Sequence, residues 1–529
     1  MPRLIHELIE FSAQQSPEAE ALVDRQRRLS YAQLDEEVRR AAGGMARLGL
    51  ARYERVAVLL PKTTEAVVAM FGATRAGGAF VPVNPVLKPR QVRHILRDCN
   101  VRLLVTSRSL LSRIESILPD CHDLRWVVTV DDTAPENPDH DSLHFAAWHE
   151  LLAGEPRLPA PGTIDQDMAA ILNTSGSTGK PKGVVLSHQN LVAGAESVIQ
   201  YLGKGPDERI LCVLPLSFDY GLSQVTTALR CGGTAVLLDY LLPGDIRKAV
   251  KRERITGLAG VPSLWHQIAH QPWLEELDGP LRYITNSGGA LPAAVLERLR
   301  AGLPGTEIFL MYGLTEAFRS TYLPPEELDR RPDSIGIPIP GAEITVINDQ
   351  GEPAACGEPG ELVHRGCHVA LGYWNDPERT AERFRPAPRQ LDGLPVSQPA
   401  VWSGDRVRRD AGGYLYFLGR DDSMIKTSGY RVSPTEVEEA VYTSGQVKEA
   451  AAIGIPDEQL GEAIVVVAEP TGASFDPQAI LAHCREELPN YMVPRTIVDY
   501  GRLPHTPNGK VDRRQLREQF CEEEAGSDA

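Results

Sequence analysis

Paired cysteines, long apolar runs and clusters of basic residues are all missing from this sequence of 529 residues. The eight cysteines include no Cys-x-x-Cys pair, which excludes the usual zinc and redox spacings, so we expect reduced thiols. No window approaches the ~20 apolar residues of a membrane span, and the segment Met1–Glu7 reaches a charge before any apolar run develops. We therefore expect a cytoplasmic protein without a membrane span.

The charge balance excludes a nucleic-acid surface. The formal net charge is −16, and no Lys/Arg-rich run occurs. The contents of 42% hydrophobic and 24% charged residues are ordinary for a soluble globular protein, so the negative charge is read as an aid to solubility. The chain is longer than one hydrophobic core usually serves, and we expect two or more domains.

Expected strands and helices alternate between residues 29 and 254. This alternation predicts right-handed βαβ units and mainly parallel sheets, and therefore an α/β fold. The expected strands lie at 29–34, 55–60, 79–83, 101–106, 126–130, 210–214 and 234–238, and the expected helices at 38–48, 65–76, 189–202, 221–230 and 245–254.

The pattern changes from about residue 342 to short alternating strands with turns. Residues 401–409 and 414–418, joined by the turn 410–413, predict a hairpin in a small β-rich subdomain at about 342–421. After Asp422 a mixed pattern of strands and helices fills about a hundred residues, which is enough for a separate domain. We therefore expect an N-terminal domain over 1–421 and a C-terminal domain over 422–529.

A loop of small hydroxyl residues, glycines and lysines lies between two apolar runs, in Ile171-Leu-Asn-Thr-Ser-Gly-Ser-Thr-Gly-Lys-Pro-Lys-Gly183. Such a loop lets backbone N–H groups approach an anion, which predicts a phosphate site. A Walker A loop needs four residues between its first glycine and the Gly-Lys pair, whereas Gly176 is followed after two by Gly179-Lys180. A flexible linker is the other alternative, but it would not need apolar strands on both sides.

Seven further motifs follow this loop along the chain: Met311-Tyr-Gly-Leu-Thr-Glu316, Gly360-Glu-Leu362, Gly372-Tyr-Trp374, Ser403-Gly-Asp405, Gly419-Arg-Asp-Asp422, Lys426-Thr-Ser-Gly-Tyr-Arg431 and Thr506-Pro-Asn-Gly-Lys510. With the loop, they resemble in order and spacing the motifs of the adenylate-forming superfamily, which includes acyl-CoA synthetases, adenylation domains of nonribosomal peptide synthetases, and luciferases. The resemblance implies a large N-terminal domain of two αβ layers and a β-rich subdomain, a small mobile C-terminal lid hinged at Asp422, and an active site between them.

The chemistry implied by the resemblance is ATP-dependent activation of a carboxylic acid, with Mg²⁺, followed by transfer to a thiol. Phosphate-binding candidates are the loop residues Thr174, Ser175, Gly176, Ser177, Thr178, Gly179 and Lys182. By resemblance Tyr312 packs on adenine, Thr315 contacts the α-phosphate and Glu316 holds Mg²⁺. The alternative is that Tyr312 belongs to the core and Glu316 is an acid at a helix start.

The resemblance also assigns the remaining nucleotide residues and the lid. Asp405 resembles the aspartate that accepts both ribose hydroxyls, and Arg420 a second ribose or phosphate contact. The turn Gly288-Gly289-Ala290 resembles the one that lies along adenine. Lys510 resembles the adenylation lysine, which bridges the substrate carboxylate and the α-phosphate, although most such lysines are solvated. Lys426, Gly429 and Arg431 belong to the region that the rotating lid brings in for thiol transfer.

The substrate pocket is predicted by the same comparison. Asp219 resembles the aspartate that pairs with a substrate α-amino group, and its alternative is an N-cap of the helix expected from Gly221. Arg319 could meet a second carboxylate on the substrate or pair with an internal acid. The pocket positions, mostly small or polar, do not favour a long hydrocarbon tail; the others are Tyr220, Ser223, Ala259, Thr285, Ser287, Met311 and Ser320.

These residues leave several functions open. An amino acid or small polar acid is the expected substrate, and the alternative is an acyl-CoA synthetase acting on a non-amino acid. A luciferase-type oxygenase and a non-catalytic nucleotide-binding scaffold are further alternatives, although the scaffold usually lacks the acid or lysine retained here as Glu316 and Lys510. Because no carrier domain follows Lys510 in the sequence, we expect the thiol to come from coenzyme A or a separate carrier protein.

Overall fold

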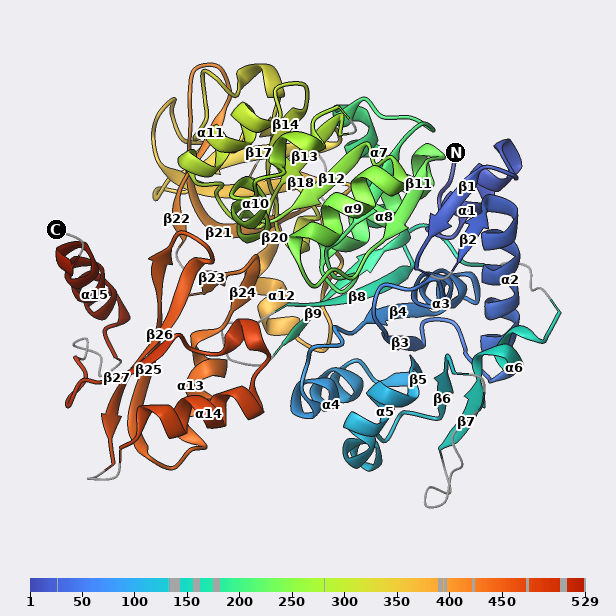
Figure 1. Ribbon diagram of the computed structural model, residues 1–529, viewed down its shortest axis with the longest axis horizontal. Coiled ribbons are helices and arrows are strands. Elements are labelled where there is room, and N and C mark those ends of the chain that lie inside the picture. Colours follow the sequence, from blue (N-terminus) through green and yellow to red (C-terminus); the bar gives the residue numbers. More distant parts are fainter. Residues whose placement is uncertain are drawn as a thin grey trace.

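The computed structural model describes residues 1–25, 27–131, 133, 143–155, 162–174, 181–279, 281–388, 393, 397–420, 424–471, 475–504 and 511–527. Two large sheets with helices packed on them form most of the N-terminal part, and a small β-rich unit and a C-terminal α+β unit follow (Figure 1). The expected α/β fold is confirmed. No helix within the described ranges is long and apolar enough to cross a membrane.

The first large sheet has eight strands. Its central strands are parallel, whereas the two strands that flank the predicted phosphate loop are antiparallel. In spatial order the strands are β19 (Gly372–Tyr373), β9 (Lys182–Ser187), β8 (Met168–Thr174), β4 (Ala79–Pro82), β3 (Arg55–Leu59), β5 (Val101–Thr106), β6 (Trp126–Thr129) and β7 (His144–Ala147).

The second large sheet has nine strands, with a parallel centre and an antiparallel pair at each end. In spatial order these are β16 (Ile337–Pro338), β15 (Thr321–Leu323), β14 (Glu307–Tyr312), β13 (Tyr283–Asn286), β12 (Gly257–Gly260), β10 (Arg209–Cys212), β11 (Thr234–Leu237), β1 (Glu20–Val23) and β2 (Arg28–Ser30).

Within the described residues, eleven helices of the N-terminal part pack mainly on these sheets. One core cluster joins residues of six of them, including Leu34, Val67, Leu191 and Val225, with strand residues of both sheets. The helices are α1 (Glu7–Gln15), α2 (Tyr31–Arg47), α3 (Thr64–Arg75), α4 (Pro89–Asp98), α5 (Arg108–Ile114), α6 (Trp148–Leu152), α7 (His188–Leu202), α8 (Asp219–Cys231), α9 (Pro243–Glu253), α10 (Pro262–Ala269) and α11 (Ala293–Gly302).

The strand predicted over residues 29–34 is wrong in its second half. The strand β2 ends at Ser30, and α2 begins at Tyr31. The cause is a capping box: the Ser30 hydroxyl accepts from the Gln33 amide, and the Gln33 side chain accepts from the Ser30 amide. Two orphan N–H groups of the helix start are satisfied in this way, which favours the helix over the apolar alternation of the sequence.

The β-rich unit is a five-stranded antiparallel sheet of β17 (Ala342–Ile347), β18 (Gly360–Gly366), β21 (Pro399–Arg409), β20 (Phe384–Pro386) and β22 (Leu415–Arg420), with α12 (Pro377–Arg383) beside it. The predicted hairpin is β21 and β22, closed by the turn at Asp410–Gly413.

The C-terminal unit has its own hydrophobic core around Val437, Ile464 and Ile480. Its five-stranded sheet is β24 (Tyr430–Val432), β23 (Ile425–Thr427), β26 (Gly461–Pro470), β25 (Val447–Asp457) and β27 (Thr496–Asp499), and its helices are α13 (Pro434–Tyr442), α14 (Pro477–Glu487) and α15 (Arg513–Ser527). The division at residue 422 stays a prediction, because Asp422 lies outside the described residues.

The C-terminal unit rests on α4 of the N-terminal part (Figure 1). Arg90 pairs with Glu439 at 2.6 Å, and the Lys88 ammonium donates to the Arg485 carbonyl at 3.1 Å. The amide of Asn84 donates to the Tyr430 hydroxyl at 3.5 Å, and the Tyr430 ring stacks on another ring of the same unit. These contacts hold the C-terminal unit against α4 and the segment just before it.

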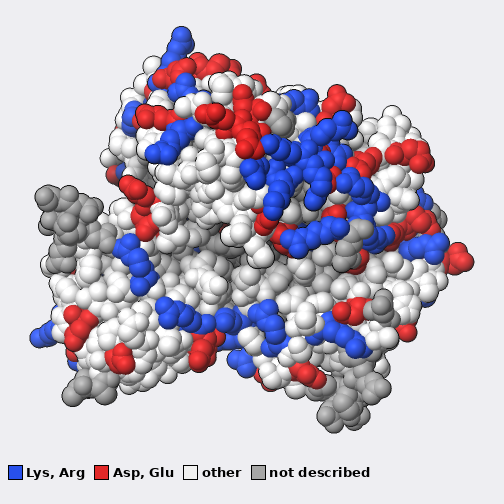
Figure 2. Space-filling model, viewed as in Figure 1, with Lys and Arg blue, Asp and Glu red and all other residues white. Residues whose placement is uncertain are grey.

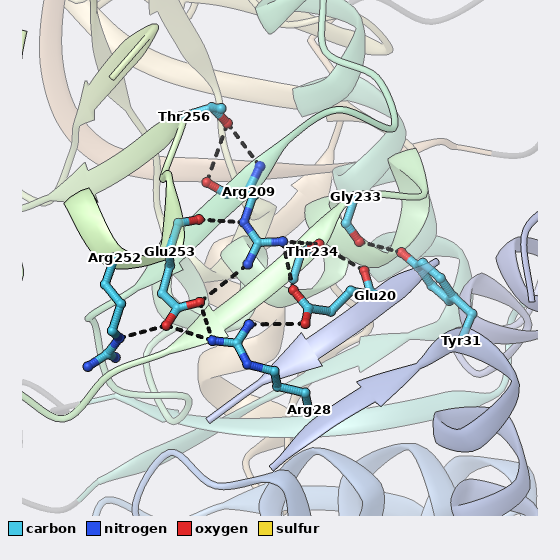
Figure 3. Close-up of polar contacts among 9 residues, drawn as sticks. All are labelled: Glu20, Arg28, Tyr31, Arg209, Gly233, Thr234, Arg252, Glu253 and Thr256. Carbon is cyan, nitrogen blue, oxygen red and sulfur yellow. Dashed lines mark hydrogen bonds and ion pairs between the residues drawn. The ribbon is translucent and has the colours of Figure 1, made fainter. Parts of the chain in front are cut away.

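A partly buried ion network around Glu253 joins the N-terminal strands β1 and β2 to the neighbouring strands of the second sheet (Figure 3). Glu253 is 4% exposed and accepts from Arg28 at 2.7 Å, while Glu20 accepts from Arg209 at 2.7 Å. The Tyr31 hydroxyl donates to the Gly233 carbonyl at 2.6 Å. Buried charges are costly unless they are paired, and here each carboxylate has guanidinium partners.

Lys and Arg side chains gather over α9 on the face drawn in Figure 2, although the net charge of the chain is negative. The basic residues of this helix are paired with acids: Arg247 and Lys251 with Glu276, Lys248 with Asp245, and Arg252 with Glu253. The charges of these basic residues are therefore largely neutralised locally.

Candidate active site

A cavity of about 810 Å³ lies between the two large sheets, the β21–β22 hairpin and the C-terminal unit. It opens into the hollow that Figure 2 shows between the C-terminal unit and the rest of the molecule. Residues that follow β13 and β14 line it, as do residues of the β23–β24 turn. Sites of open α/β sheets occur at the carboxyl ends of parallel strands, where this cavity lies.

An acid, a lysine and a tyrosine form the polar centre beside the cavity. Lys182, the first residue of β9, donates to Glu316 Oε1 at 3.0 Å and to the Tyr373 hydroxyl at 2.8 Å. The Tyr373 hydroxyl also donates to Glu316 Oε1, at 2.7 Å. Glu316 comes from the short 3₁₀ turn η3 (Thr315–Ala317) after β14. Three segments distant in sequence therefore meet at one carboxylate.

Electrostatics keep Glu316 ionised in this centre. Burial alone would raise the pKa of this carboxyl, but Lys182, Arg431 and the Tyr373 hydroxyl hold the pKa of Glu316 well below its usual value. Burial lowers the pKa of Lys182, and Glu316 counteracts that shift. Lys182 and Glu316 thus form a buried pair that keeps its charges at neutral pH.

The arrangement fits the divalent cation that the family resemblance implies. Glu316 is 2% exposed, and within the described part of the chain its Oε2 has no hydrogen-bond partner. An ionised buried oxygen without a partner is costly, and Mg²⁺ is a hard cation that prefers carboxylate oxygens. Glu316 Oε2 is the atom that would hold it.

The residues predicted to bind adenine and ribose lie together on a different wall of the cavity. Tyr312 ends β14, and its hydroxyl donates a short hydrogen bond to Asp405 Oδ2. Asp405 on β21 is directly opposite Arg420 on β22 in the hairpin register. Gly288, with φ of +83°, begins the turn Gly288–Ala290, which also lines the cavity. The positions assigned to a nucleoside therefore surround one space.

The predicted acid pocket is only partly assembled by the fold. Asp219, Tyr220, Ser287, Met311 and Arg319 line the cavity. Four other predicted positions do not line it: Ser223, Ala259, Thr285 and Ser320. Of these, Thr285 bonds the Tyr220 hydroxyl and so supports the wall from behind, whereas Ser320 bonds His364 Nδ1 at 2.9 Å, away from the lining residues.

Asp219 occupies the first turn of α8 and is not its N-cap. The N-cap residue is Phe218, which makes no side-chain cap, and α8 begins at Asp219 rather than near Gly221. Burial raises the pKa of Asp219, and Arg319, the Tyr220 amide and the Thr315 hydroxyl counteract this rise. The carboxylate therefore faces the cavity with a cation and a hydroxyl near it.

The turn between β23 and β24 forms the side of the main cavity that belongs to the C-terminal unit. Lys426, Gly429 and Arg431 line the main cavity, and Gly429 and Tyr430 also line an adjoining cavity of about 530 Å³. Gly429 has φ of +82°, and a Cβ added there would lie 2.6 Å from Val261 Cγ1. Glycine is needed at this position for both reasons, since the turn and the N-terminal part touch there.

Several predicted site residues fall outside the part that the structure describes. These are Ser175, Gly176, Ser177, Thr178 and Gly179 of the phosphate loop, Asp422 at the hinge, Lys510, and the side chain of Arg420. Thr174, at the start of that loop, lines the cavity, and its buried hydroxyl has no partner among the described residues. The roles proposed for the residues outside the described part stay predictions.

Sequence reasoning missed two groups. Tyr373 stands out in the sequence only as part of a Gly-Tyr-Trp motif, yet its hydroxyl touches both Lys182 and Glu316. Glu436 on α13 lines the cavity at the lid interface, and burial raises its pKa to about 7. Nothing in the local sequence signals either contact, because both depend on segments distant along the chain.

The fold and this site define an α/β enzyme of the adenylate-forming class, and comparisons with known proteins agree. The pattern of the AMP-binding enzyme family matches residues 9–374, and that of the AMP-binding enzyme C-terminal domain matches residues 436–510. The chain therefore belongs to the AMP-binding enzyme family.

Relatives of two kinds are similar to the chain. It is 33% identical over 97% of its length to one of the linear gramicidin synthase proteins of Brevibacillus parabrevis, of which it spans 10%. It is 32% identical over 96% of its length to feruloyl-CoA synthase of an Amycolatopsis species, of which it covers 97%. Among solved structures, the o-succinylbenzoate CoA synthetase of Bacillus subtilis, bound to a product analogue, has a TM-score of 0.82 at 25% identity, with 97% of this chain and 98% of that chain covered.

Proposed function

We propose that this enzyme activates a carboxylic acid with ATP and passes the acyl group to a thiol. In the first step an oxygen of the substrate carboxylate attacks the α-phosphorus, a P–O bond forms, and the bond to the β-phosphate breaks so that pyrophosphate leaves. In the second step the thiol sulfur attacks the acyl carbon, the thiol loses its proton, and the C–O bond to AMP breaks. The observation that carries this proposal is the Lys182–Glu316–Tyr373 centre beside the Tyr312–Asp405 wall.

The chain's own residues would position the reactants and screen their charge. Two anions must meet in the first step, so the site has to supply positive charge and hold them in line. Lys182 and the hydroxyl of Thr174 lie where phosphates would be held, and Asp405 offers two oxygens to a ribose diol. Mg²⁺ held by Glu316 would neutralise phosphate charge as it develops. We assign to Lys510 the contact that joins the substrate carboxylate and the α-phosphate.

The second cavity is the proposed path of the thiol. It adjoins the acid pocket at Ser217 and Phe218 and shares Gly429 and Tyr430 of the C-terminal unit with it. The feruloyl-CoA synthase relative favours coenzyme A as acceptor, and the gramicidin synthase relative favours a carrier-bound thiol. We propose a thiol of this pantetheine kind and a cytoplasmic site of action, where acid, ATP and thiol are all supplied.

The acid itself is proposed to be an amino acid. Asp219 faces the cavity as a carboxylate, and it is not the N-cap of its helix. A carboxylate at this wall returns the hydration energy that an ammonium group loses on entering a closed site. The second candidate, a non-amino carboxylic acid, is favoured by the similarity to feruloyl-CoA synthase.

A panel of carboxylic and amino acids tests the function through acid-dependent pyrophosphate release, followed by detection of the thioester after addition of coenzyme A. We expect release with at least one acid and about a hundredfold loss in Glu316→Gln, because removing one charge from the buried centre removes about 3 kcal/mol of transition-state stabilisation. Glu307→Gln is the matched control: Glu307 begins β14, the strand that precedes Glu316, but it is exposed, and its ion-pair partner among the described residues is Lys204. Absence of release with every acid would refute the proposal.

A further inference from the structure

Arg319 is a buried cation on the acid pocket that has no carboxylate partner. It is 2% exposed and lines the cavity, and no ion pair joins it to any acid in the part of the chain that the structure describes. Among the described residues its Nη1 donates to the sulfur of Met311 alone, at 3.4 Å, and its Nε has no hydrogen-bond partner. Sulfur is a weak acceptor, so the donors of this guanidinium are largely unused.

The guanidinium is nevertheless held in a fixed place. Its carbon lies 4.6 Å from the centre of the Tyr220 ring, over the ring face, and the Tyr220 hydroxyl is tied to Thr285. The Met311 sulfur that it contacts also accepts from the Tyr201 hydroxyl, at 3.0 Å. A cation over an aromatic face is stabilised by the ring, but this does not replace the hydrogen bonds that a desolvated guanidinium needs.

The alternative left open by the sequence was that Arg319 pairs with an internal acid. Arg319 acts electrostatically on Asp219, yet no ion pair within 4 Å joins the two side chains among the described residues. The pocket therefore presents a guanidinium and a carboxyl group that are not paired with each other. A ligand that satisfies both must itself carry one group of each sign in this region.

Asp219 and Arg319 are suited to different groups of one ligand. The Thr315 hydroxyl, which precedes Glu316 in the chain, and Arg319 both act on the Asp219 carboxyl. An α-amino acid carries the carboxylate to be activated, the ammonium on the next carbon, and then the side chain. Asp219 would take the ammonium, which leaves Arg319 for the side chain.

We propose that the substrate carries a second carboxylate, bound by Arg319, and is an amino dicarboxylic acid. This inference rests on the proposed function and names its substrate class. The planar fork of a guanidinium matches a carboxylate with two parallel N–H···O bonds, which an amide or a hydroxyl cannot reproduce. Arg319 is thus a specificity residue, and it takes no part in the transfer of the acyl group.

The test compares acidic amino acids with their amides, whose side chains have the same shape and no charge. L-Aspartate, L-glutamate and L-2-aminoadipate are measured against L-asparagine and L-glutamine by pyrophosphate release. We expect at least one acid to exceed its amide by tenfold or more in kcat/KM. Arg319→Met should lower that kcat/KM on the order of a hundredfold, mostly through KM, and change the amides by less than threefold. Arg319→Lys, which keeps the charge, should retain part of the preference.

Arg230→Met is the matched control, because Arg230 also lies near an aromatic ring but pairs with Glu196 far from the cavity. It should leave the preference unchanged. Replacing a buried charge by an apolar residue of similar length is often neutral for stability, and a cooperative thermal transition at the wild-type temperature or above shows that Arg319→Met folds.

Four outcomes would overturn the inference. If amides were activated as well as the acids, Arg319 would only line the pocket. The same would hold if Arg319→Met lowered kcat/KM equally for acids and amides. Release with monocarboxylic acids alone would also refute it, and would leave the proposed function standing. Release with no acid at all would remove both.

Discussion

Gly429 offers a direct test of whether the β23–β24 turn must reach the N-terminal part for thiol transfer. A Cβ at this position would lie 2.6, 2.8 and 3.0 Å from Cγ1, Cβ and Cγ2 of Val261. Overpacking of this kind costs about 1 to 3 kcal/mol. The positive φ of Gly429 adds a further ~1 kcal/mol of backbone strain to an alanine at this position. Because that strain is the same in the docked and the undocked C-terminal unit, it does not change the free energy of docking.

Gly429→Ala should therefore weaken docking by the contact term alone, which corresponds to a rate loss of about 5- to 150-fold. We expect that loss in thiol transfer from preformed acyl-AMP, and unchanged pyrophosphate release in the first step. Gly445→Ala is the matched control, because Gly445 has φ of +73° in the same unit and a Cβ there meets nothing within 4 Å. The double variant Gly429→Ala, Val261→Ala should recover much of the transfer rate. Equal losses in both steps, or equal effects of Gly429→Ala and Gly445→Ala, would refute the reasoning.

Three further predictions follow from named residues. Lys510→Ala should slow pyrophosphate release by two to three orders of magnitude, a loss of about 2 to 4 kcal/mol, and spare thiol transfer from preformed acyl-AMP; equal losses in both would contradict its role. Asp219→Ala should cost an amino acid about 2 to 5 kcal/mol in kcat/KM and improve its des-amino analogue, whereas a uniform loss would make Asp219 structural. Burial against the N-terminal part raises the pKa of Glu436 from 4.5 to about 7, so docking of the C-terminal unit should be favoured most below the lower value and weaken as the pH rises to the higher one. The thiol-transfer rate should fall over this range and level off above it, and Glu436→Gln should flatten the profile; an unchanged profile would show that Glu436 stays protonated or solvated.

The architecture of the chain follows from its sequence pattern because apolar alternation and turn residues act locally. The alternating strands and helices and the β21–β22 hairpin agree with the expected α/β fold. The one clear error, the strand over 29–34, arose where Ser30 and Gln33 form a capping box that the apolar pattern conceals. Local hydrogen bonding overrode periodicity there.

The site was less predictable, since its groups are brought together by segments far apart. Glu316 was found from a motif, but its partner Tyr373 lies 57 residues later. The choice between an internal acid and a substrate carboxylate for Arg319 could be made only once the acids around it had positions. The positions of Thr285 behind the wall and of Ser320 beside His364 likewise need the fold, because small polar residues carry no sign of which way they face.

The ion network that fastens β1 and β2 has a consequence for synthesis of the chain. Leu22 pairs with Ala235, about 210 residues later, so the first strands leave the ribosome long before their partner. At ~5 to 20 residues per second this interval is about 10 to 40 s. Meanwhile Leu22 and Val23 lack the neighbouring strand β11, Glu20 lacks Arg209, and Arg28 lacks Glu253. An apolar strand with one unpaired edge is prone to wrong association. A nascent chain that ends before β11 should therefore depend on chaperones and aggregate when released, whereas one that includes α9 already carries everything needed to cover its own beginning.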